Sequence, residues 1–190
     1  MKIITHLRGS GLVSIINGIR AKRITSRTGV FVSVGLATVV TALVGTALAT
    51  PGAGIVSATV VASASFVDPV DMKLKTKGEH HKVLHAPDAQ ETVIQQVIIA
   101  PGGSTGWHSH PGPVVVLIKA GQLSFFSSED PSCTATIYSA GQAFIDPGQG
   151  HVHLGRNLGS ENVELWAVYF DVPTGGPFRL DAANPGNCGF

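Results

Sequence analysis

Short runs of apolar or alternating residues, separated by glycine and proline turns, fill the chain from about residue 70 onward. Runs of about four to ten residues with such breaks are typical of β-strands. No long stretch of this region shows convincing helical periodicity, which disfavours parallel βαβ folds. We therefore predict an all-β sandwich or barrel. The predicted strands are Thr92–Ala100, Val114–Lys119, Gln122–Phe126, Cys133–Tyr138, Ala143–Asp146 and Val163–Val172.

A different pattern fills the N-terminal part of the chain. Residues 29–49 are apolar and rich in small side chains, follow basic residues and end in Ala47-Leu48-Ala49, a small-x-small pattern typical of signal-peptidase cleavage. The stretch is also nearly long enough to span a bilayer. We predict a signal peptide or a retained N-terminal membrane anchor at 1–49, a linker or edge segment at 50–70 and one folded domain at 71–190. Both alternatives place the domain outside the cytoplasm, either secreted or held at the cell envelope.

Charge is distributed unevenly along the 190 residues. A charged content of 13% and a hydrophobic content of 44% argue against a disordered chain. The net charge of +1 combines six basic and no acidic residues in 1–49 with seven basic and twelve acidic residues beyond, a net charge of −5 there. The domain therefore has no basic surface that predicts a nucleic-acid partner. Membrane contact is expected only through a retained N-terminal segment.

The two cysteines, Cys133 and Cys188, both lie in the part predicted to be exported. Cysteine pairs in an oxidising compartment tend to form disulfides. Neither cysteine has metal-ligand spacing to the other, so we favour a disulfide over two free buried thiols.

Four of the eight histidines form two pairs beside glycine and proline turns, His108 with His110 and His151 with His153. Residues two apart on a strand face the same side, so each pair can present two imidazoles to one cavity. Imidazole suits first-row metals such as Zn, Fe, Cu and Ni. No chemistry is assigned to the other four, which lie in the leader or in a polar segment: His6, His80, His81 and His85.

The spacing of these residues resembles the cupin superfamily over Thr92–Val172. The first motif is matched by Gly102, His108, His110 and Gly121. The second is matched by Gly141, Pro147, His153 and Asn157, with one extra residue between Pro147 and His153. The resemblance implies a cupin double-stranded β-helix, a jelly-roll barrel with its ligand cavity inside.

The resemblance also implies a divalent transition metal, which could be Fe, Mn, Zn, Ni or Cu, held by His108, His110 and His153. The extra residue keeps His151 open as an additional ligand. The family's fourth ligand is a glutamate, and Val114 stands in its place. Three neutral imidazoles would leave positions open for water or substrate, as a catalytic metal site does.

Three functions are compatible with a cupin-like barrel that holds these histidines. The first is an exported metal-binding cupin, for which an oxygenase or isomerase activity on a small organic substrate is one option. The alternative is a non-catalytic module that binds a small molecule or a sugar. A third is a cell-surface interaction module held by the N-terminal anchor. Because cupins commonly pair edge to edge, a homodimer is a possible assembly.

Strand alternation also suggests which other side chains face the cavity. Gln96, Phe126 and Trp166 could line it, although a shift of one residue in strand phase would turn each outward. Trp107 precedes His108 and is expected to face the opposite side. Asp146 ends a predicted strand before a proline, where a turn role is favoured over a place at the cavity mouth.

Overall fold

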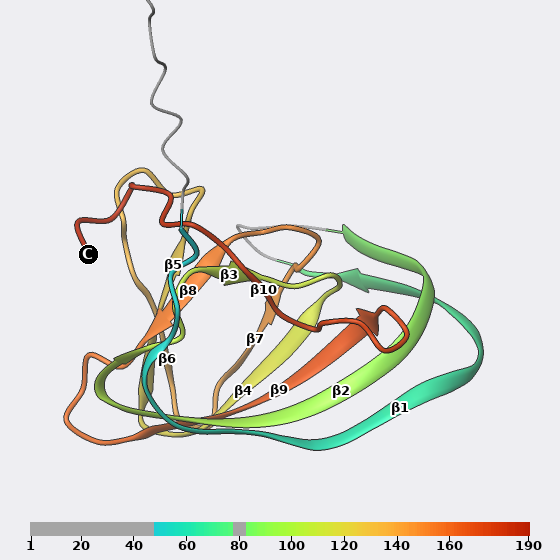
Figure 1. Ribbon diagram of the computed structural model, residues 1–190, viewed down its shortest axis with the longest axis horizontal. Coiled ribbons are helices and arrows are strands. Elements are labelled where there is room, and N and C mark those ends of the chain that lie inside the picture. Colours follow the sequence, from blue (N-terminus) through green and yellow to red (C-terminus); the bar gives the residue numbers. More distant parts are fainter. Residues whose placement is uncertain (1–47, 78–82) are drawn as a thin grey trace, which may run out of the picture. The chain divides into compact units, whose positions relative to one another are not determined.

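The computed structural model describes residues 48–77 and 83–190, and the regular elements in those ranges are all strands (Figure 1). The all-β prediction is therefore confirmed for the described residues. Its strands are β1 (Ala53–Lys75), β2 (Val83–Ser104), β3 (His108–Ser109), β4 (Val114–Ala120), β5 (Gln122–Ser127), β6 (Thr136–Ser139), β7 (Ala143–Asp146), β8 (His153–Arg156), β9 (Val163–Val172) and β10 (Leu180–Asp181).

The predicted signal or anchor segment, residues 1–49, lies outside the described residues except for its last two. Within the described ranges no helix is long and apolar enough to cross a membrane.

The strands form one sheet whose pairings are all antiparallel. Its main path runs β10-β3-β8-β2-β9-β4-β7, while β1 pairs with β2, and β5 pairs with β6 and β8. The sheet curves into a nearly closed barrel. Strand β8 is central to it, because β8 meets β3, β2 and β5 and thereby brings distant parts of the chain to one end of the barrel.

Alternation along β4 and β9 separates the barrel interior from its outer surface. Val114 and Val116 on β4 are buried, whereas the residue between them is only partly covered. The same period of two runs along β9, as expected for a strand with one face on the core. The main core contains Val93, Val97, Ile99, Val114, Val116, Ile118, Leu123, Val163, Leu165, Ala167, Tyr169 and Val172.

Strand β1 forms a long antiparallel hairpin with β2 and, within residues 48–77 and 83–190, pairs with no other strand (Figure 1). Most of its residues are exposed. Residues 50–67 have a uniform Ala/Ser/Val/Thr composition that the sequence analysis could place only as a linker or an edge. The structure makes most of this stretch an edge strand.

Strand β6 is shorter than the predicted strand Cys133–Tyr138 and begins at Thr136. The preceding residues form a turn, in which Cys133 has a positive φ of 50°. The Asp130 carboxylate accepts hydrogen bonds from the backbone N–H groups of Ser132 and Thr134. This local capping holds the turn and delays the start of the strand.

A second core lies under the C-terminal tail. Cys133 and Cys188 form the predicted disulfide, which joins the β5–β6 turn to the tail. Trp107 packs with Cys188 in this cluster, together with Phe126 and Leu154. Trp107 therefore lies away from the histidine cavity, on the side that strand alternation predicted.

The first described residues are fastened to the same tail. The Thr50 backbone N–H donates a hydrogen bond of 3.0 Å to the carbonyl of Ala182. The Thr50 hydroxyl accepts a bond of 2.9 Å from the Trp107 backbone N–H. Ala182 in turn donates to the Trp107 carbonyl, so three separate parts of the chain meet here.

Candidate metal centre

Three histidines converge inside the barrel, and they are the three implied by the motif resemblance. His108 on β3 and His153 on β8 are direct register partners, and His110 follows β3. The ring centroids lie 4.9 Å apart for His108 and His110, 4.3 Å for His108 and His153, and 5.1 Å for His110 and His153. One ligand nitrogen from each lies within 4.8 Å of those of the other two. All three side chains are buried.

Each of these rings has its Nδ1 bound to a backbone carbonyl. His108 Nδ1 lies 2.9 Å from Gly106 O, His110 Nδ1 lies 2.7 Å from Phe178 O, and His153 Nδ1 lies 3.2 Å from His151 O. A carbonyl can only accept, so Nδ1 must carry the proton in each ring. The neutral ring then keeps an unshared electron pair on Nε2.

Burial keeps the three rings neutral. It lowers the pKa of His108 well below the ordinary value, and the Arg179 guanidinium and His110 lower it further. Burial likewise lowers the pKa of His110, against the opposing effect of its bond to Phe178 O. It also lowers the pKa of His153 well below the ordinary value. A buried neutral imidazole with a fixed tautomer is the form that binds metals.

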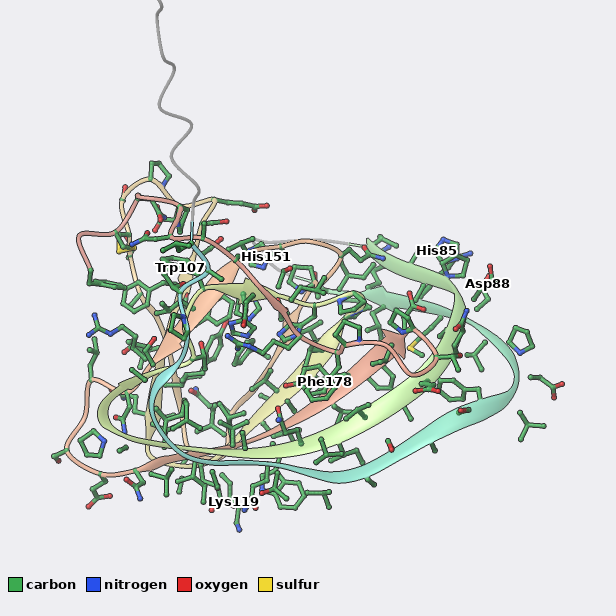
Figure 2. All side chains as sticks on the ribbon, viewed as in Figure 1. His85, Asp88, Trp107, Lys119, His151 and Phe178 are labelled. Atoms are coloured by element: carbon green, nitrogen blue, oxygen red, sulfur yellow. A yellow bond between two sulfur atoms is a disulfide. The ribbon has the colours of Figure 1, made fainter. Side chains whose placement is uncertain are left out.

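His151 lies outside the group of three and belongs to a second group of candidate ligands, with Asp146 and His153. Its Nδ1 lies 2.9 Å from Asp146 Oδ1, and its Nε2 lies 3.0 Å from Ser127 Oγ. It does not line the cavity that the three histidines share. Figure 2 shows its ring near the upper rim of the barrel in that view. His151 thus orients Asp146 rather than facing the cavity.

Asp146 is the residue whose role the sequence analysis misjudged. Its side chain is only 1% exposed, and it lines the cavity rather than completing a surface turn. Its Oδ1 accepts the hydrogen bond from His151, whereas its Oδ2 is buried and has no hydrogen-bond partner. Oδ2 lies 3.8 Å from His110 Nε2.

The pKa of Asp146 reflects opposing effects. Burial raises it, but the hydrogen bond from His151 lowers it, and the net pKa is lowered. The carboxyl group is therefore ionised at neutral pH.

The extra residue between the second motif's proline and histidine is absorbed in a turn. Gly148, Gln149 and Gly150 all have positive φ, and the His151 N–H closes the turn onto the Gly148 carbonyl at 2.9 Å. The insertion therefore stays outside β8, and His153 keeps its position beside His108.

The donor set fits a first-row transition metal. The ligand atoms of His108, His110 and His153 lie within 4.8 Å of one another, and those of Asp146, His151 and His153 form a second such group. Imidazole nitrogens and carboxylate oxygens are ligands of the kind such ions take. The residues that would hold the ion are His108, His110 and His153.

The cavity beside the histidines has a volume of about 330 Å³. Its lining includes the polar side chains of Gln95, Tyr169 and Arg179. The Tyr169 hydroxyl donates to Gln95 Oε1 at 2.9 Å. Arg179 is held by Asp181 and by the carbonyl of Thr105, each at 2.7 Å. These three residues match no motif in the sequence, so they could not be predicted from it.

The predicted cavity residues Gln96, Phe126 and Trp166 do not line it. Gln96 and Trp166 instead donate hydrogen bonds to Glu164. Phe126 packs in the second core with Trp107. Their neighbours Gln95, Phe125 and Leu165 line the cavity, so at all three places the strand has the other of the two phases that alternation left open.

The remaining motif residue and histidines have other roles. Asn157 is fully buried, and its Nδ2 donates to the carbonyls of Ile99 and Glu161. His85 lies 2.8 Å from the Asp71 carboxylate on the β1–β2 hairpin. His80 and His81 lie outside the described residues, as does His6.

Comparisons with known proteins point to solved structures. No family model and no curated protein matches the chain. A cupin-like protein from Thermotoga maritima MSB8 is 25% identical with a TM-score of 0.43, covering 49% of this chain and 65% of its own. A double-stranded β-helix protein from Klebsiella pneumoniae is 20% identical with a TM-score of 0.41, covering 64% and 90%.

An oxalate oxidase structure is 21% identical with a TM-score of 0.40, and the match covers 47% of this chain and 45% of the oxidase. The chain thus spans less than two thirds of the Thermotoga protein and of the oxidase. The two motifs, the nearly closed antiparallel barrel and the histidines gathered inside it together agree with the cupin-like pattern of the sequence, in which Val114 stands in place of the first motif's glutamate.

Proposed function

We propose that this chain is a metal-binding cupin that acts on a small organic molecule outside the cytoplasm. One observation carries the proposal: in His108, His110 and His153 a backbone carbonyl holds Nδ1, which leaves the three Nε2 atoms free for one ion. Hydrogen bonds of this kind fix the tautomer and the ring orientation of metal ligands.

The proposed cofactor is a divalent transition metal, Fe, Mn, Zn, Ni or Cu. Imidazole nitrogens suit these ions. When bound, the ion would supply Lewis acidity and, if redox-active, electron transfer. The chain's own contribution is to hold the ligands in a buried cavity that limits access of water.

The cavity supports a small substrate with a polar or anionic group. Its volume of about 330 Å³ is at the small end of ligand pockets. Arg179 is fixed in place by Asp181 and the Thr105 carbonyl, so its guanidinium can orient an anionic group beside the histidines. Tyr169 offers a hydroxyl, and burial raises its pKa, so it stays protonated. An oxygenase or an isomerase is the class of enzyme we propose.

A non-catalytic module that binds a small molecule or a sugar is the second candidate. Much of the lining is apolar, including Val114, Val116, Phe144 and Leu165. An apolar wall with a few polar groups is the usual composition of a binding pocket. Binding that survives removal of the metal would favour this candidate.

Location and assembly belong to the same proposal. The disulfide is consistent with an extracytoplasmic location. We propose either secretion after cleavage or retention by an N-terminal anchor, and a homodimer as the assembly. The exposed, singly paired strand β1 supports an assembly of two copies, because unpaired strand edges are templates for pairing.

Elemental analysis of the purified full-length chain tests the metal centre. The wild-type chain is compared with the double variant His108→Ala/His153→Ala, before and after chelation and reconstitution. We expect near-stoichiometric metal in the wild type and its loss in the double variant. An exposed histidine offers a matched control, because His85→Ala removes an imidazole from the hairpin rather than the cavity.

A folded wild-type chain that takes up none of the five metals would overturn the proposal. Metal retained by the double variant would overturn the assignment of its ligands. With the metal established, an oxygen-uptake screen of small organic acids would separate the oxygenase from the binding module.

A further inference from the structure

The first motif lacks the carboxylate that the family's pattern places on β4, because residue 114 is valine. Three neutral imidazoles leave the full charge of a dication uncompensated in a buried cavity. Placing uncompensated charge in a low-dielectric interior is costly. A nearby carboxylate would lower that cost.

Strand pairing places one carboxylate beside this position. Val114 on β4 and Asp146 on β7 are direct partners in an antiparallel register. Directly opposed residues of antiparallel strands project from the same face of the sheet. Both side chains are buried and line the same cavity as the three histidines.

The two carboxylate oxygens of Asp146 have different surroundings. Oδ1 accepts the bond from His151 Nδ1 at 2.9 Å, and His151 is held in turn by Ser127. Oδ2 is buried without a hydrogen-bond partner and lies 3.8 Å from His110 Nε2. A buried polar atom without a partner requires an explanation, and an absent ion is one of the usual ones.

Given the proposed metal centre, on which this step rests, we infer that Asp146 is the fourth protein ligand and binds the ion through Oδ2. The carboxylate is supplied from β7 instead of β4, across one register pair. Ser127 and His151 are positioning residues that hold Oδ1 and thereby aim Oδ2. With Asp146 bound, a divalent site carries a net charge of +1, as it would with a glutamate at position 114.

A cysteine at position 146 reports directly on metal contact. The full-length Asp146→Cys variant is depleted of metal and titrated with Co²⁺, the probe used throughout. Thiolates bind such ions readily, and a coordinated thiolate gives a thiolate-to-cobalt charge-transfer band in the near ultraviolet. We expect this band in Asp146→Cys. The control Val116→Cys places a thiol on the same cavity wall, two residues after Val114 on β4. We expect no charge-transfer band in this control.

Affinity for Co²⁺ provides an independent measurement. Loss of an outer hydrogen-bonding partner typically weakens metal binding by about 10–100-fold. For Asp146→Ala we expect a loss greater than ~100-fold, beyond that range. Adding Val114→Glu to Asp146→Ala should recover most of this loss, since the carboxylate then comes from the neighbouring strand. Thermal melts of each variant establish that it is folded.

The outcomes separate this inference from the metal centre itself. If the wild type binds Co²⁺ and His108→Ala/His153→Ala does not, the three-histidine centre stands. Absence of the charge-transfer band in folded Asp146→Cys then overturns the role of Asp146 alone. A loss of only about 10–100-fold in Asp146→Ala would likewise make it a positioning residue. If the wild type binds no Co²⁺, both proposals fail together.

Discussion

At the scale of single residues, the three cavity histidines share one arrangement, in which a backbone carbonyl holds Nδ1 and burial keeps the ring neutral. The stability of the metal-free chain should therefore depend on pH. The folded-state pKa values of His108, His110 and His153 are lowered, whereas the unfolded chain has the ordinary value of about 6.5. Between these values the unfolded state binds more protons.

The first prediction follows from that difference. The histidine contribution to the free energy of unfolding is fully present above about pH 6.5 and is lost as pH falls from there toward the folded-state values. Thermal melts of chelated protein between pH 8 and pH 5 should show a falling Tm. The slope should be smaller in His108→Ala/His153→Ala, and an equal slope in that variant would contradict this origin.

Asn157 carries the second prediction. Its Nδ2 donates to the carbonyls of Ile99 and Glu161, and its Oδ1 accepts from the Gly159 N–H. Asn157→Ala should cost about 2–4 kcal/mol of unfolding free energy, because each buried group left without a partner costs about 1–3 kcal/mol. Urea unfolding measures this cost.

Metal stoichiometry in folded Asn157→Ala should stay that of the wild type, since the side chain binds backbone and not the cavity. The exposed Asn162→Ala is the control and should be nearly neutral. A stable Asn157→Ala that loses metal would show that the motif asparagine serves the cavity instead.

How far single residues could be predicted depended on motif spacing and strand phase. Spacing located His108 and His153, because their motif positions do not depend on which way a strand faces. Strand phase could not be predicted at Gln96 and Phe126, because alternation with a period of two residues does not show which face of the strand is buried. Asp146 was misjudged because a carboxylate before Pro147 has the local pattern of a turn, and only its long-range pairing with β4 shows that it is buried.

At the scale of elements, the turn after β7 sets the position of the residues around the cavity. Gly148 has a positive φ of 60°, and a Cβ there would overlap the Gly112 carbonyl oxygen. This close approach joins the turn to the segment before β4. The turn therefore sets the positions of Asp146, at the end of β7, and of His151, directly after the turn.

The third prediction concerns this turn. Gly148→Ala should lower stability and weaken Co²⁺ binding, because the substitution adds backbone overlap to the strain of a positive φ, which alone costs about 1–3 kcal/mol. Gly141→Ala separates the two effects, since Gly141 also has a positive φ but nothing near its would-be Cβ. Its cost should be smaller, with metal affinity unchanged. Equal effects in urea unfolding and Co²⁺ titration would show that the close approach is unimportant.

Element boundaries were predictable where the pattern alternated and ended at a turn. The predicted strands Ala143–Asp146 and Val163–Val172 agree with β7 and β9. Residues 53–75 were harder, because Ala, Ser, Val and Thr follow each other without alternation and the strand is mostly exposed. Its place depends on pairing with β2, a tertiary property that local composition does not record.

At the scale of the whole molecule, the disulfide holds the C-terminal tail against the second core. It closes a loop with a sequence separation of 55 between Cys133 and Cys188. The fourth prediction is that Cys133→Ser/Cys188→Ser lowers the free energy of unfolding by about 2–4 kcal/mol, the usual range for such a loop. Reductant should lower the Tm of the wild type and leave the double variant unchanged. An unaffected wild type would show that tail packing alone suffices.

The bonds that fasten Thr50 to Ala182 have a consequence for how the barrel is connected. They place the start and the end of the barrel segment together, with Cys188 packed beside the same tryptophan. A short linker from the tail to Thr50, with new ends opened at the exposed Gly141 turn, would give a circular permutant with every strand pair intact. We therefore expect the permutant to close the same barrel, although its strands are made in a different order.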